Sequence, residues 1–361
     1  MAADKASRPA VSVVVPVYNV EGYLRECLDS LCAQTLGDLE VVCVDDGSTD
    51  GSLALIREYA ARDPRIAVFT KPNSGYGASM NQGIARAHGE YIGILESDDF
   101  IEPAAFEVLY RAAKEHDAEA VKANYFYYWS KPQPKSELVP SIDAGLAGFG
   151  DPREKTGVFS LAPAVWSALY RRDFLEENGI RFLETPGASY QDASFNFKVW
   201  ACARRAVFLE EAFVHYRQDN ESSSVNSKEK VYCVCDEYAE MQRFLDGRPE
   251  VKERLQGILV WMKFTSYWWN YGRINDRFKP EFLARARQEL GDDLRAGRLD
   301  RSLFEPWKEA LLGALLKSPE AFEDWLVQRP GKINTFRRYY STGGWPLVIK
   351  VLRGKFQRAG K

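Results

Sequence analysis

The sequence lacks the features that mark membrane-spanning, secreted and disulfide-rich proteins. No apolar stretch reaches the roughly 18 uncharged residues that a membrane-spanning helix requires. The amino-terminal segment MAADKASRPA has no apolar core like that of a secretory signal. The six cysteines form no CxxC pair and lie mostly in apolar runs, as buried reduced thiols usually do. These absences predict a cytoplasmic protein whose cysteines stay reduced.

The motifs of several common enzyme classes are also missing. Gly75 and Gly77 do not follow the first predicted strand and lack the third glycine of a GxGxxG dinucleotide-binding site. The chain has no GxxxxGK[ST] phosphate-binding loop and no GxSxG turn that would present a serine nucleophile. A net charge of −3 offers no uniform basic surface for a nucleic acid. We therefore expect no nucleic-acid partner.

Acidic residues are absent from the last 31 residues, Gly331–Lys361, which carry eight lysines and arginines. Aromatic and apolar residues are interspersed among these basic residues, a composition typical of segments that settle on anionic lipid. The other interpretation is a solvated basic end that covers the body of the protein. Both remain open, so peripheral contact at the inner face of a membrane is one expectation.

The first hundred residues alternate short apolar runs with amphipathic stretches, the pattern of βαβ units that build a parallel sheet. Apolar residues at helical spacing separate the runs and face the predicted sheet. The predicted strands are Val11–Val17, Leu39–Asp46, Ile66–Thr70 and Tyr91–Asp99. Two acidic clusters end strands of this series, Asp45–Asp46 and Glu96–Asp99. Because such strands share the sheet edge where ligands bind, we expect the two clusters to lie together.

The Glu96–Asp99 cluster predicts a site for a divalent cation. Magnesium and manganese take hard oxygen ligands, commonly one or two carboxylates plus substrate phosphates. The alternative is a solvated acidic loop, but adjacent carboxylates without a cation repel one another. Asp46, in Asp-Asp-Gly-Ser, is suited to accept hydrogen bonds from a base or a ribose. The same four residues are equally typical of an ordinary turn and helix cap, so both interpretations remain open.

The character of the sequence changes after Val225, where long amphipathic helical stretches begin. We predict one domain over residues 8–225 and a mainly helical domain over residues 226–361. The aromatic residues in the helical part are interpreted as core packing. The aromatic run Tyr125–Trp129 is interpreted as a buried strand, with stacking on sugar rings as the alternative.

Three stretches within Val11–Phe100 resemble glycosyltransferase family 2: VSVVVPVYNVEGYLRECLDSLCAQTL, VVCVDDGSTDGS and NSGYGASMNQGIARAHGEYIGILESDDF. The resemblance implies the α/β fold called GT-A, with a Rossmann-like, mostly parallel sheet. It also implies an inverting transferase that uses a nucleotide sugar, with uracil favoured as the base. Many members have Asp-Ser-Asp-Asp where this chain has Glu96, which leaves Asp98 and Asp99 as the metal ligands.

The resemblance implies further roles for individual residues. Asp46 would contact the base, and Asp98 would hold the ribose as well as the metal. Lys71 is a candidate for phosphate or nucleotide contact. The full set expected to contact the nucleotide is Pro16, Val17, Tyr18, Asn19, Glu21, Asp46, Lys71, Gly75, Ser97, Asp98 and Arg217.

The similarity continues into Tyr190-Gln191-Asp192, where the family has its catalytic base. An inverting displacement needs one carboxylate on the acceptor side to take the hydroxyl proton, and Asp192 is suited to this role. The alternative role for Asp192 is the N-cap of the helix that follows. The segment from His215 to Ser224 resembles the family's closing loop. Arg217 is then a candidate for diphosphate binding and His215 for the metal, although structural roles are more frequent for such residues.

These observations predict an inverting, metal-dependent glycosyltransferase with Asp192 as base and a divalent cation, manganese or magnesium, as cofactor. The acceptor is expected to be a glycan or lipid-linked glycan in surface polysaccharide assembly. One alternative is a catalytically silent module with the same fold, because fold does not fix function. A sugar nucleotidyltransferase is another, although the first predicted strand lacks the glycine- and arginine-rich loop of such enzymes.

Overall fold

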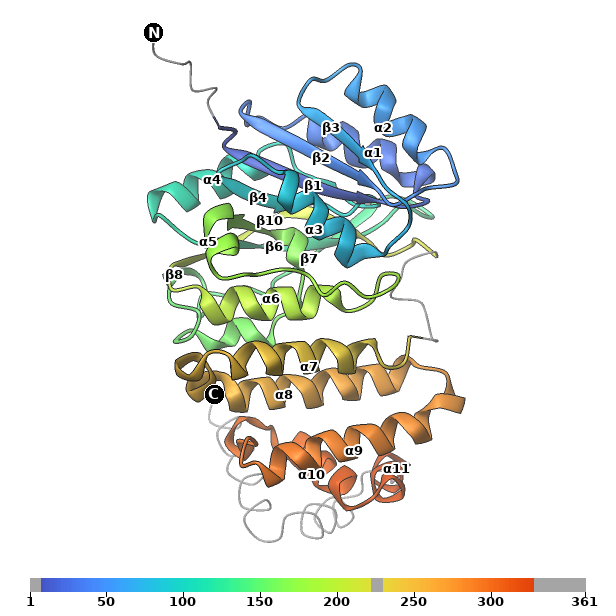
Figure 1. The fold of residues 1–361 in the computed structure, drawn as a ribbon, viewed down its shortest axis with the longest axis vertical. Coiled ribbons are helices and arrows are strands. Elements are labelled where there is room, and N and C mark those ends of the chain that lie inside the picture. The colour runs from blue at the N-terminus through green and yellow to red at the C-terminus, as the bar shows by residue number, and fades with distance from the viewer. Residues whose placement is uncertain (1–7, 222–229, 328–361) are drawn as a thin grey trace. The chain divides into compact units, whose positions relative to one another are not determined.

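The computed structural model describes residues 8–221 and 230–327. The backbone divides into two compact units, residues 1–226 and 227–361. The first unit contains all the strands of the described residues, and the second is helical in its described part (Figure 1). Two earlier predictions, the basic end Gly331–Lys361 and the loop residues Ser222–Ser224, lie outside the described residues.

The first unit is built on one mixed sheet with the strand order β3-β2-β1-β4-β9-β6-β10-β5, in which β7 pairs with β6 and β8 with β10. The first four strands of this order are parallel, and so are β6 and β10. The antiparallel strand β9 joins the two parallel groups. The strands are β1 Val11–Val17, β2 Leu39–Asp45, β3 Ile66–Thr70, β4 Tyr91–Ile94, β5 Phe100–Ile101, β6 Ala120–Trp129, β7 Lys135–Val139, β8 Gly148–Gly150, β9 Ala168–Arg171 and β10 Ala206–Arg217.

Helices cover both faces of this sheet. Because successive side chains of a strand point to opposite faces, Val13 and Val15 of β1 join the core beneath α1, α2 and α4. Val14 faces α3, and a Cβ atom at Gly83 of that helix would lie 2.3 Å from the Val14 side chain. A glycine at position 83 therefore lets α3 approach β1 closely. The helices are α1 Glu21–Cys32, α2 Ser52–Ala60, α3 Tyr76–Arg86, α4 Ala105–Glu115, α5 Arg172–Glu177 and α6 Gln191–Cys202.

The fourth strand is shorter than the sequence predicts. It ends at Ile94, and the backbone then turns, so that the Asp99 N–H donates to the carbonyl of Glu96 at 3.1 Å. The acidic cluster consequently lies in a tight loop between β4 and β5, and the strand predicted over Tyr91–Asp99 is wrong in its last five residues. This loop holds the acids more compactly than an extended strand would.

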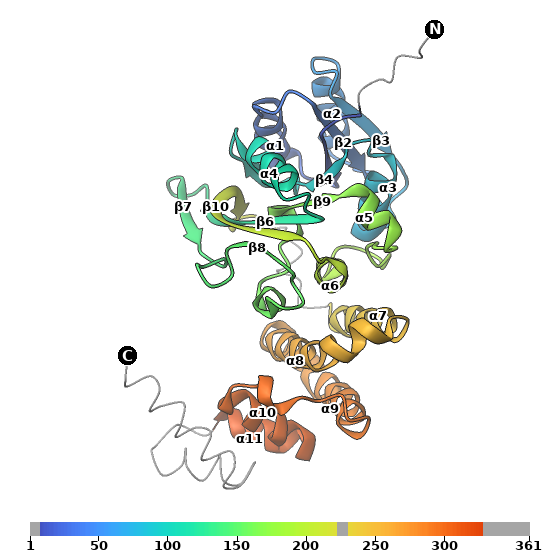
Figure 2. The ribbon, with the colours of Figure 1, turned by 90° about the vertical axis from the view of Figure 1, so that its left-hand side faces the viewer.

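The described part of the second unit is helical, as predicted, and is shown from a second direction in Figure 2. Its core contains a buried ion pair between Lys263 and Asp293, whose Nζ and Oδ2 atoms are 2.7 Å apart. No helix within residues 8–221 and 230–327 is long and apolar enough to cross a membrane. The helices are α7 Cys233–Asp246, α8 Pro249–Arg273, α9 Lys279–Arg295, α10 Pro306–Lys317 and α11 Pro319–Val327.

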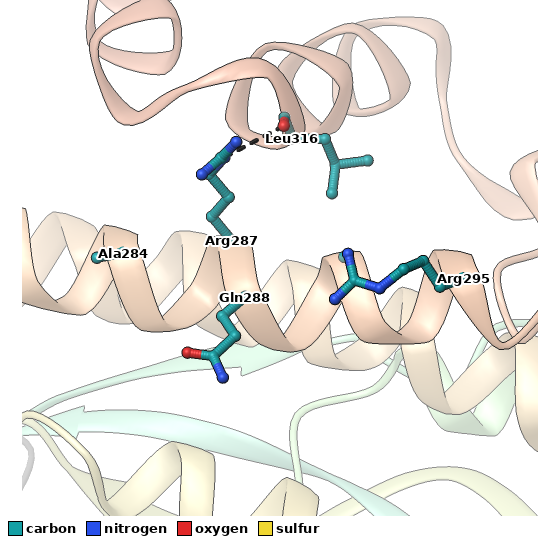
Figure 3. A pocket seen from close by; sticks show the side chains of 6 residues that line it. Ala284, Arg287, Gln288, Arg295 and Leu316 are labelled. Carbon is teal, nitrogen blue, oxygen red and sulfur yellow. Dashed lines mark hydrogen bonds between the residues drawn. The ribbon is translucent and has the colours of Figure 1, made fainter.

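A shallow pocket lies between α9 and α10 of the second unit (Figure 3). Arg287, Gln288 and Arg295 contribute its polar side chains, and the Arg287 guanidinium donates to the Leu316 carbonyl at 3.2 Å. None of the predicted site residues lines this pocket.

Candidate active site

The two acidic clusters follow strands that flank β1 on either side. Asp45 ends β2, and the Glu96–Asp99 loop follows β4. Parallel pairing of both strands with β1 brings these ends to the same edge of the sheet. The expected meeting of the two clusters at one edge thus follows from the strand order.

Asp99 is completely buried, and one of its oxygens has no hydrogen-bond partner. The backbone N–H of Arg217 donates to Oδ1 at 2.8 Å, whereas Oδ2 is buried without a partner. Burial, together with the neighbouring charge of Asp98, raises the pKa of Asp99 well above its usual value. An unpartnered carboxylate oxygen beside a second carboxylate is a donor set that suits a divalent cation.

Arg217 is placed differently from the prediction. Its side chain is 2% exposed, its Nε donates to the Asp98 carbonyl at 2.8 Å, and its terminal nitrogen pairs with Glu26. The guanidinium also lies 4.9 Å from the ring centres of Tyr23 and Tyr128. Because Nε and one terminal nitrogen are engaged within the protein and the side chain is almost fully buried, Arg217 holds the Asp98–Asp99 loop, and a direct contact with a diphosphate is not supported.

Glu96 faces Tyr76, a residue that the sequence analysis did not single out. The Tyr76 hydroxyl donates to Oε1 at 2.7 Å. Burial, opposed by this hydrogen bond and assisted by the charges of Asp98 and Asp192, raises the pKa of Glu96 to about 8. Tyr76 begins α3 directly after Gly75, and only the fold brings it to the acidic loop.

Asp192 lies close enough to this loop to share its electrostatic environment. Its negative charge acts on both Glu96 and Tyr216, and the charges of Asp98 and Asp99 also act on Tyr216. Burial raises the pKa of Asp192 itself to about 6, against hydrogen bonds from backbone N–H groups. Two separate segments of the chain therefore bring carboxylates to one site.

The start of α6 differs from the alternative interpretation of Asp192 as an N-cap. Tyr190 occupies the cap position with a left-handed φ of 64°, and Asp192 lies within the first turn of the helix. Non-glycine residues with positive φ are uncommon and cluster at functional sites. A carboxylate in the first turn is also favoured by the helix dipole.

Asp46 is held by the loop that precedes α3. Its Oδ1 accepts hydrogen bonds from Lys71 and from the Ser74 N–H, and its Oδ2 accepts one from the Gly75 N–H at 2.9 Å. Gly75 has a φ of 93° and lies so close to the neighbouring loop that a Cβ atom would be 2.7 Å from the Thr185 carbonyl oxygen. Two predicted nucleotide contacts, Asp46 and Lys71, are thus paired with each other at the sheet edge.

The segment after β1 contributes one strongly exposed aromatic side chain. Tyr18 is 51% exposed, while Pro16 and Val17 are buried within β1. Asn19 has a left-handed φ of 49° and accepts the Thr49 N–H at 2.8 Å. The arrangement leaves Tyr18 accessible to a ligand at the carboxyl end of β1.

Glu21 has a structural contact in place of the predicted one. Its carboxylate accepts the Gly51 N–H at 2.9 Å, which ties the start of α1 to the start of α2. Ser97, another predicted contact, is nearly buried in the acidic loop beside Asp98. Asn220 was not assigned a role from sequence, yet its amide donates to Asp98 Oδ2 at 2.7 Å.

His215 was predicted to complete the metal shell, and the structure assigns both of its ring nitrogens to other partners. Nδ1 lies 2.9 Å from the Ser136 hydroxyl and Nε2 lies 2.8 Å from Glu102. The ring stacks between Phe100 and Phe126, at centroid distances of 4.4 and 4.8 Å. Because both ring nitrogens are engaged, His215 is not included among the ligands of the candidate metal site.

No group of three His, Cys, Asp or Glu side chains in the described residues is arranged to hold a metal ion. Asp98 and Asp99 alone supply the carboxylate oxygens of the candidate site. Such a pair is the protein share expected where substrate phosphates provide the other ligands. The residues present therefore fit a cation that is bound together with a nucleoside diphosphate.

Residues 12–179 match the family model described as Glycosyl transferase family 2. Over these residues the chain is similar to that family. The match extends from β1 to the short helix α5, and therefore includes the acidic loop but not Asp192.

Relatives of this domain are found in several bacteria. The uncharacterized glycosyltransferase EpsJ of Bacillus subtilis (strain 168) is 34% identical over 220 residues, which cover 59% of this chain and 62% of EpsJ. The glycosyltransferase GlyA of Streptococcus pneumoniae is 33% identical over 57% of this chain and 30% of its own length. The chain thus spans about three fifths of the first relative and less than a third of the second.

The fold is also found among solved structures. The crystal structure of S. aureus TarS residues 1–349 in complex with UDP-GlcNAc matches with a TM-score of 0.66 at 19% identity, over 87% of this chain and 90% of that chain. At this level of identity the similarity shows the fold, which is the predicted GT-A-like α/β sheet with a helical carboxy-terminal region.

Proposed function

We propose that this chain is an inverting glycosyltransferase that moves a sugar from a nucleoside diphosphate sugar, with uracil as the base, to an acceptor hydroxyl. The observation that carries the proposal is the convergence of Asp192 with the Glu96–Asp99 loop, because an acid on the acceptor side must face the donor site. The similarity of residues 12–179 to glycosyltransferase family 2 supports the reaction class.

The similar proteins support the donor and the biological setting. TarS was crystallised with UDP and with UDP-GlcNAc. A hyaluronan synthase and a chondroitin synthase of Pasteurella multocida are each 43% identical to this chain over 100 residues. We infer a role in the assembly of a polysaccharide or glycoconjugate, with a glycan as acceptor.

The residues divide the chemistry between two sides of the site. Asp192 is ionised at neutral pH, since its pKa is raised only to about 6, and it takes the proton of the acceptor hydroxyl as that oxygen attacks the sugar carbon. On the donor side Asp98 and Asp99 hold the divalent cation, magnesium or manganese, and Arg217 fixes their loop. When bound, the cation supplies charge that stabilises the leaving diphosphate.

Asp46, Lys71 and Tyr18 are proposed to contact the nucleotide. The Asp46–Lys71 pair lies at the end of β2, and Tyr18 follows β1. An accessible aromatic ring beside a charged pair suits a base with polar edges and a flat face.

The proposal is tested with a panel of uridine and guanosine diphosphate sugars, by measuring nucleoside diphosphate release with and without manganese. We expect release from a uridine diphosphate sugar that requires the metal. Asp192→Asn should lower turnover by about 100-fold or more, the usual contribution of a general base, while UDP binding is retained.

The matched control is Asp324→Asn, which alters an exposed acid of the second unit and should leave turnover unchanged. Activity that persists unchanged in EDTA would rule out the metal assignment. Equal loss of UDP binding and turnover in Asp192→Asn would indicate a structural acid.

A further inference from the structure

Four partly buried aromatic side chains form a continuous row next to the carboxylates. We call this set, Trp129, Tyr127, Tyr216 and Trp166, the aromatic wall. The ring centres of successive members are 6.2, 6.2 and 5.0 Å apart. The set comes from β6, β10 and the short 3-10 helix η2 (Val165–Ser167), so the wall is a product of tertiary structure.

The register of two strands places the central rings on one face. Tyr127 of β6 pairs with Tyr216 of β10 in the parallel ladder, and Trp129 lies two residues further along β6 on the same face. Tyr127, Tyr216 and Trp166 pack on one side against the hydrophobic core, and all four wall residues keep part of their surface exposed. Three of the four rings are therefore backed by packed protein, and the row as a whole is only partly buried.

Buried polar contacts fix the turn that carries Trp166. Lys122 is 2% exposed, and its ammonium donates to the Ala164 carbonyl and the Ser167 hydroxyl, both at 2.9 Å. The Tyr170 hydroxyl donates to the Val165 carbonyl at 2.8 Å. These hydrogen bonds hold in place the turn that carries Trp166.

The wall adjoins the candidate active site at Tyr216 and at Trp166. Tyr216 precedes Arg217, whose N–H binds Asp99, and η2 packs against α6, the helix that carries Asp192. Burial and then the charges of Asp99, Asp98, Glu96 and Asp192 raise the pKa of the Tyr216 phenol. A molecule lying along the wall would thus end within reach of the carboxylates on the Asp192 side.

We propose that the aromatic wall is the acceptor subsite and that it binds two or more sugar rings of a saccharide acceptor by stacking. This inference rests on the proposed transferase function and adds where the glycan acceptor binds and how many of its rings are held. A pyranose ring has one apolar C–H face and a polar rim, which suits aromatic rings next to carboxylates. Four rings in a row make a surface longer than one pyranose, so short oligosaccharides bind more tightly than a monosaccharide.

The test uses the full chain with three trisaccharide probes, cellotriose, maltotriose and chitotriose, and with glucose. Binding is measured in the presence of UDP by saturation-transfer NMR, which reports contact between protein and sugar protons. We expect at least one trisaccharide to bind more tightly than glucose. Trp166→Ala should weaken that binding by about fivefold to tenfold, the value of one aromatic stack, and Trp166→Phe should retain most of it.

A second variant and a control keep the outcome decisive. Trp129→Ala removes the far end of the wall, so it should weaken trisaccharide binding and leave glucose binding unchanged. Trp269→Ala, which removes a 52% exposed aromatic ring of the second unit, should change neither. If no trisaccharide binds, or if both wall variants bind it as the wild type does, the subsite is refuted.

UDP binding in the same samples separates the two proposals. If Trp166→Ala binds UDP normally but no longer binds the trisaccharide, the result supports the wall as an acceptor subsite. A wild-type protein that binds trisaccharides through Trp166 but neither binds UDP nor releases it from a UDP-sugar would refute the transferase function and leave a saccharide-binding module.

Discussion

Single carboxylates in the site are held in unfavourable electrostatic conditions. Asp99 has a buried oxygen without a partner, and the pKa values of Glu96 and Asp192 are raised by burial. Buried acids without compensating positive charge are typical of sites whose ligand supplies that charge. At the scale of the residue, this arrangement supports the proposed cation site at Asp98 and Asp99.

The raised pKa of Asp192 predicts the pH dependence of turnover. The base is active only when ionised, so kcat/KM should fall about tenfold for each pH unit below about 6 and level off above it. The measurement is the initial rate of UDP release in the presence of manganese across this range, with UDP affinity followed in parallel. A rate that is flat through pH 6 would argue against Asp192 as the base.

Glu96→Gln is expected to stabilise the protein at alkaline pH. The folded-state pKa of Glu96 lies at about 8, above its ordinary value of 4.5, so the folded state binds this proton more tightly than the unfolded state. The resulting loss of stability is absent below about pH 4.5 and complete above about pH 8. Removing the charge should raise the free energy of unfolding by about 2 kcal/mol at pH 8 and change it little at pH 4.

The measurement is thermal unfolding of both proteins without divalent cation, with Glu115→Gln, an exposed acid of α4, as the control. A stabilisation of equal size at both pH values would show that ionisation of Glu96 is not its cause.

Among the elements, the turn before α3 links three parts of the site. Gly75 donates its N–H to Asp46, Tyr76 reaches Glu96, and the Tyr76 N–H donates to the Gly187 carbonyl at 2.9 Å. A φ of 93° with a ψ of 166° at Gly75 lies in a region that is almost restricted to glycine. The turn conformation thus sets the positions of the nucleotide contact and the acidic loop together.

Gly75→Ala should lower the free energy of unfolding by about 3 kcal/mol. The new methyl group would collide with backbone atoms, and the backbone conformation itself would be strained for alanine. Gly148→Ala is the matched control, since Gly148 has a similar φ of 87° but open space around it. In Gly148→Ala only backbone strain should lower the free energy of unfolding, by about 1–2 kcal/mol. Thermal unfolding and UDP affinity measure both; equal effects of the two variants would contradict the close approach of the 185–187 loop.

Element positions could be predicted from sequence in outline but not at their ends. The alternation of apolar runs and helical spacing indicated the strands and helices of the first hundred residues, because both periodicities are local. The end of β4 at Ile94 was missed, since the turn depends on hydrogen bonds with β1 and with the acidic loop itself. The start of α6 was missed for a similar reason, because Tyr190 adopts a backbone conformation that its residue type does not favour.

At the scale of the whole molecule, each of the two units has its own buried core. In the second, Asp293 is fully buried, and Lys263 donates to it at 2.7 Å. Arg298 Nε lies 2.8 Å from Asp293 Oδ1, but its N–H is not directed at that oxygen, so this contact is electrostatic only. Lys263 is therefore the main compensation for a charge within the helical unit.

Lys263→Met should destabilise the helical unit by about 3 kcal/mol, because it leaves a buried carboxylate incompletely paired. Hydrogen exchange should accelerate in α8 and α9, while the amides of β1 and β4 keep their protection. Lys317→Met, at an exposed lysine of α10, is the control and should change neither. Equal acceleration in the sheet would show that the two units unfold as one.

Local sequence patterns were sufficient to predict the α/β class of the first unit, the helical nature of the second, and the placement of two acidic clusters after strands. These properties follow from local periodicity and from the shared edge of parallel strands. The engagement of Arg217 and His215 within the protein, and the positions of Tyr76 and Tyr216 near the carboxylates, depend on tertiary contacts. These contacts join residues up to 191 positions apart, as between Glu26 and Arg217, and no local pattern encodes such a distance.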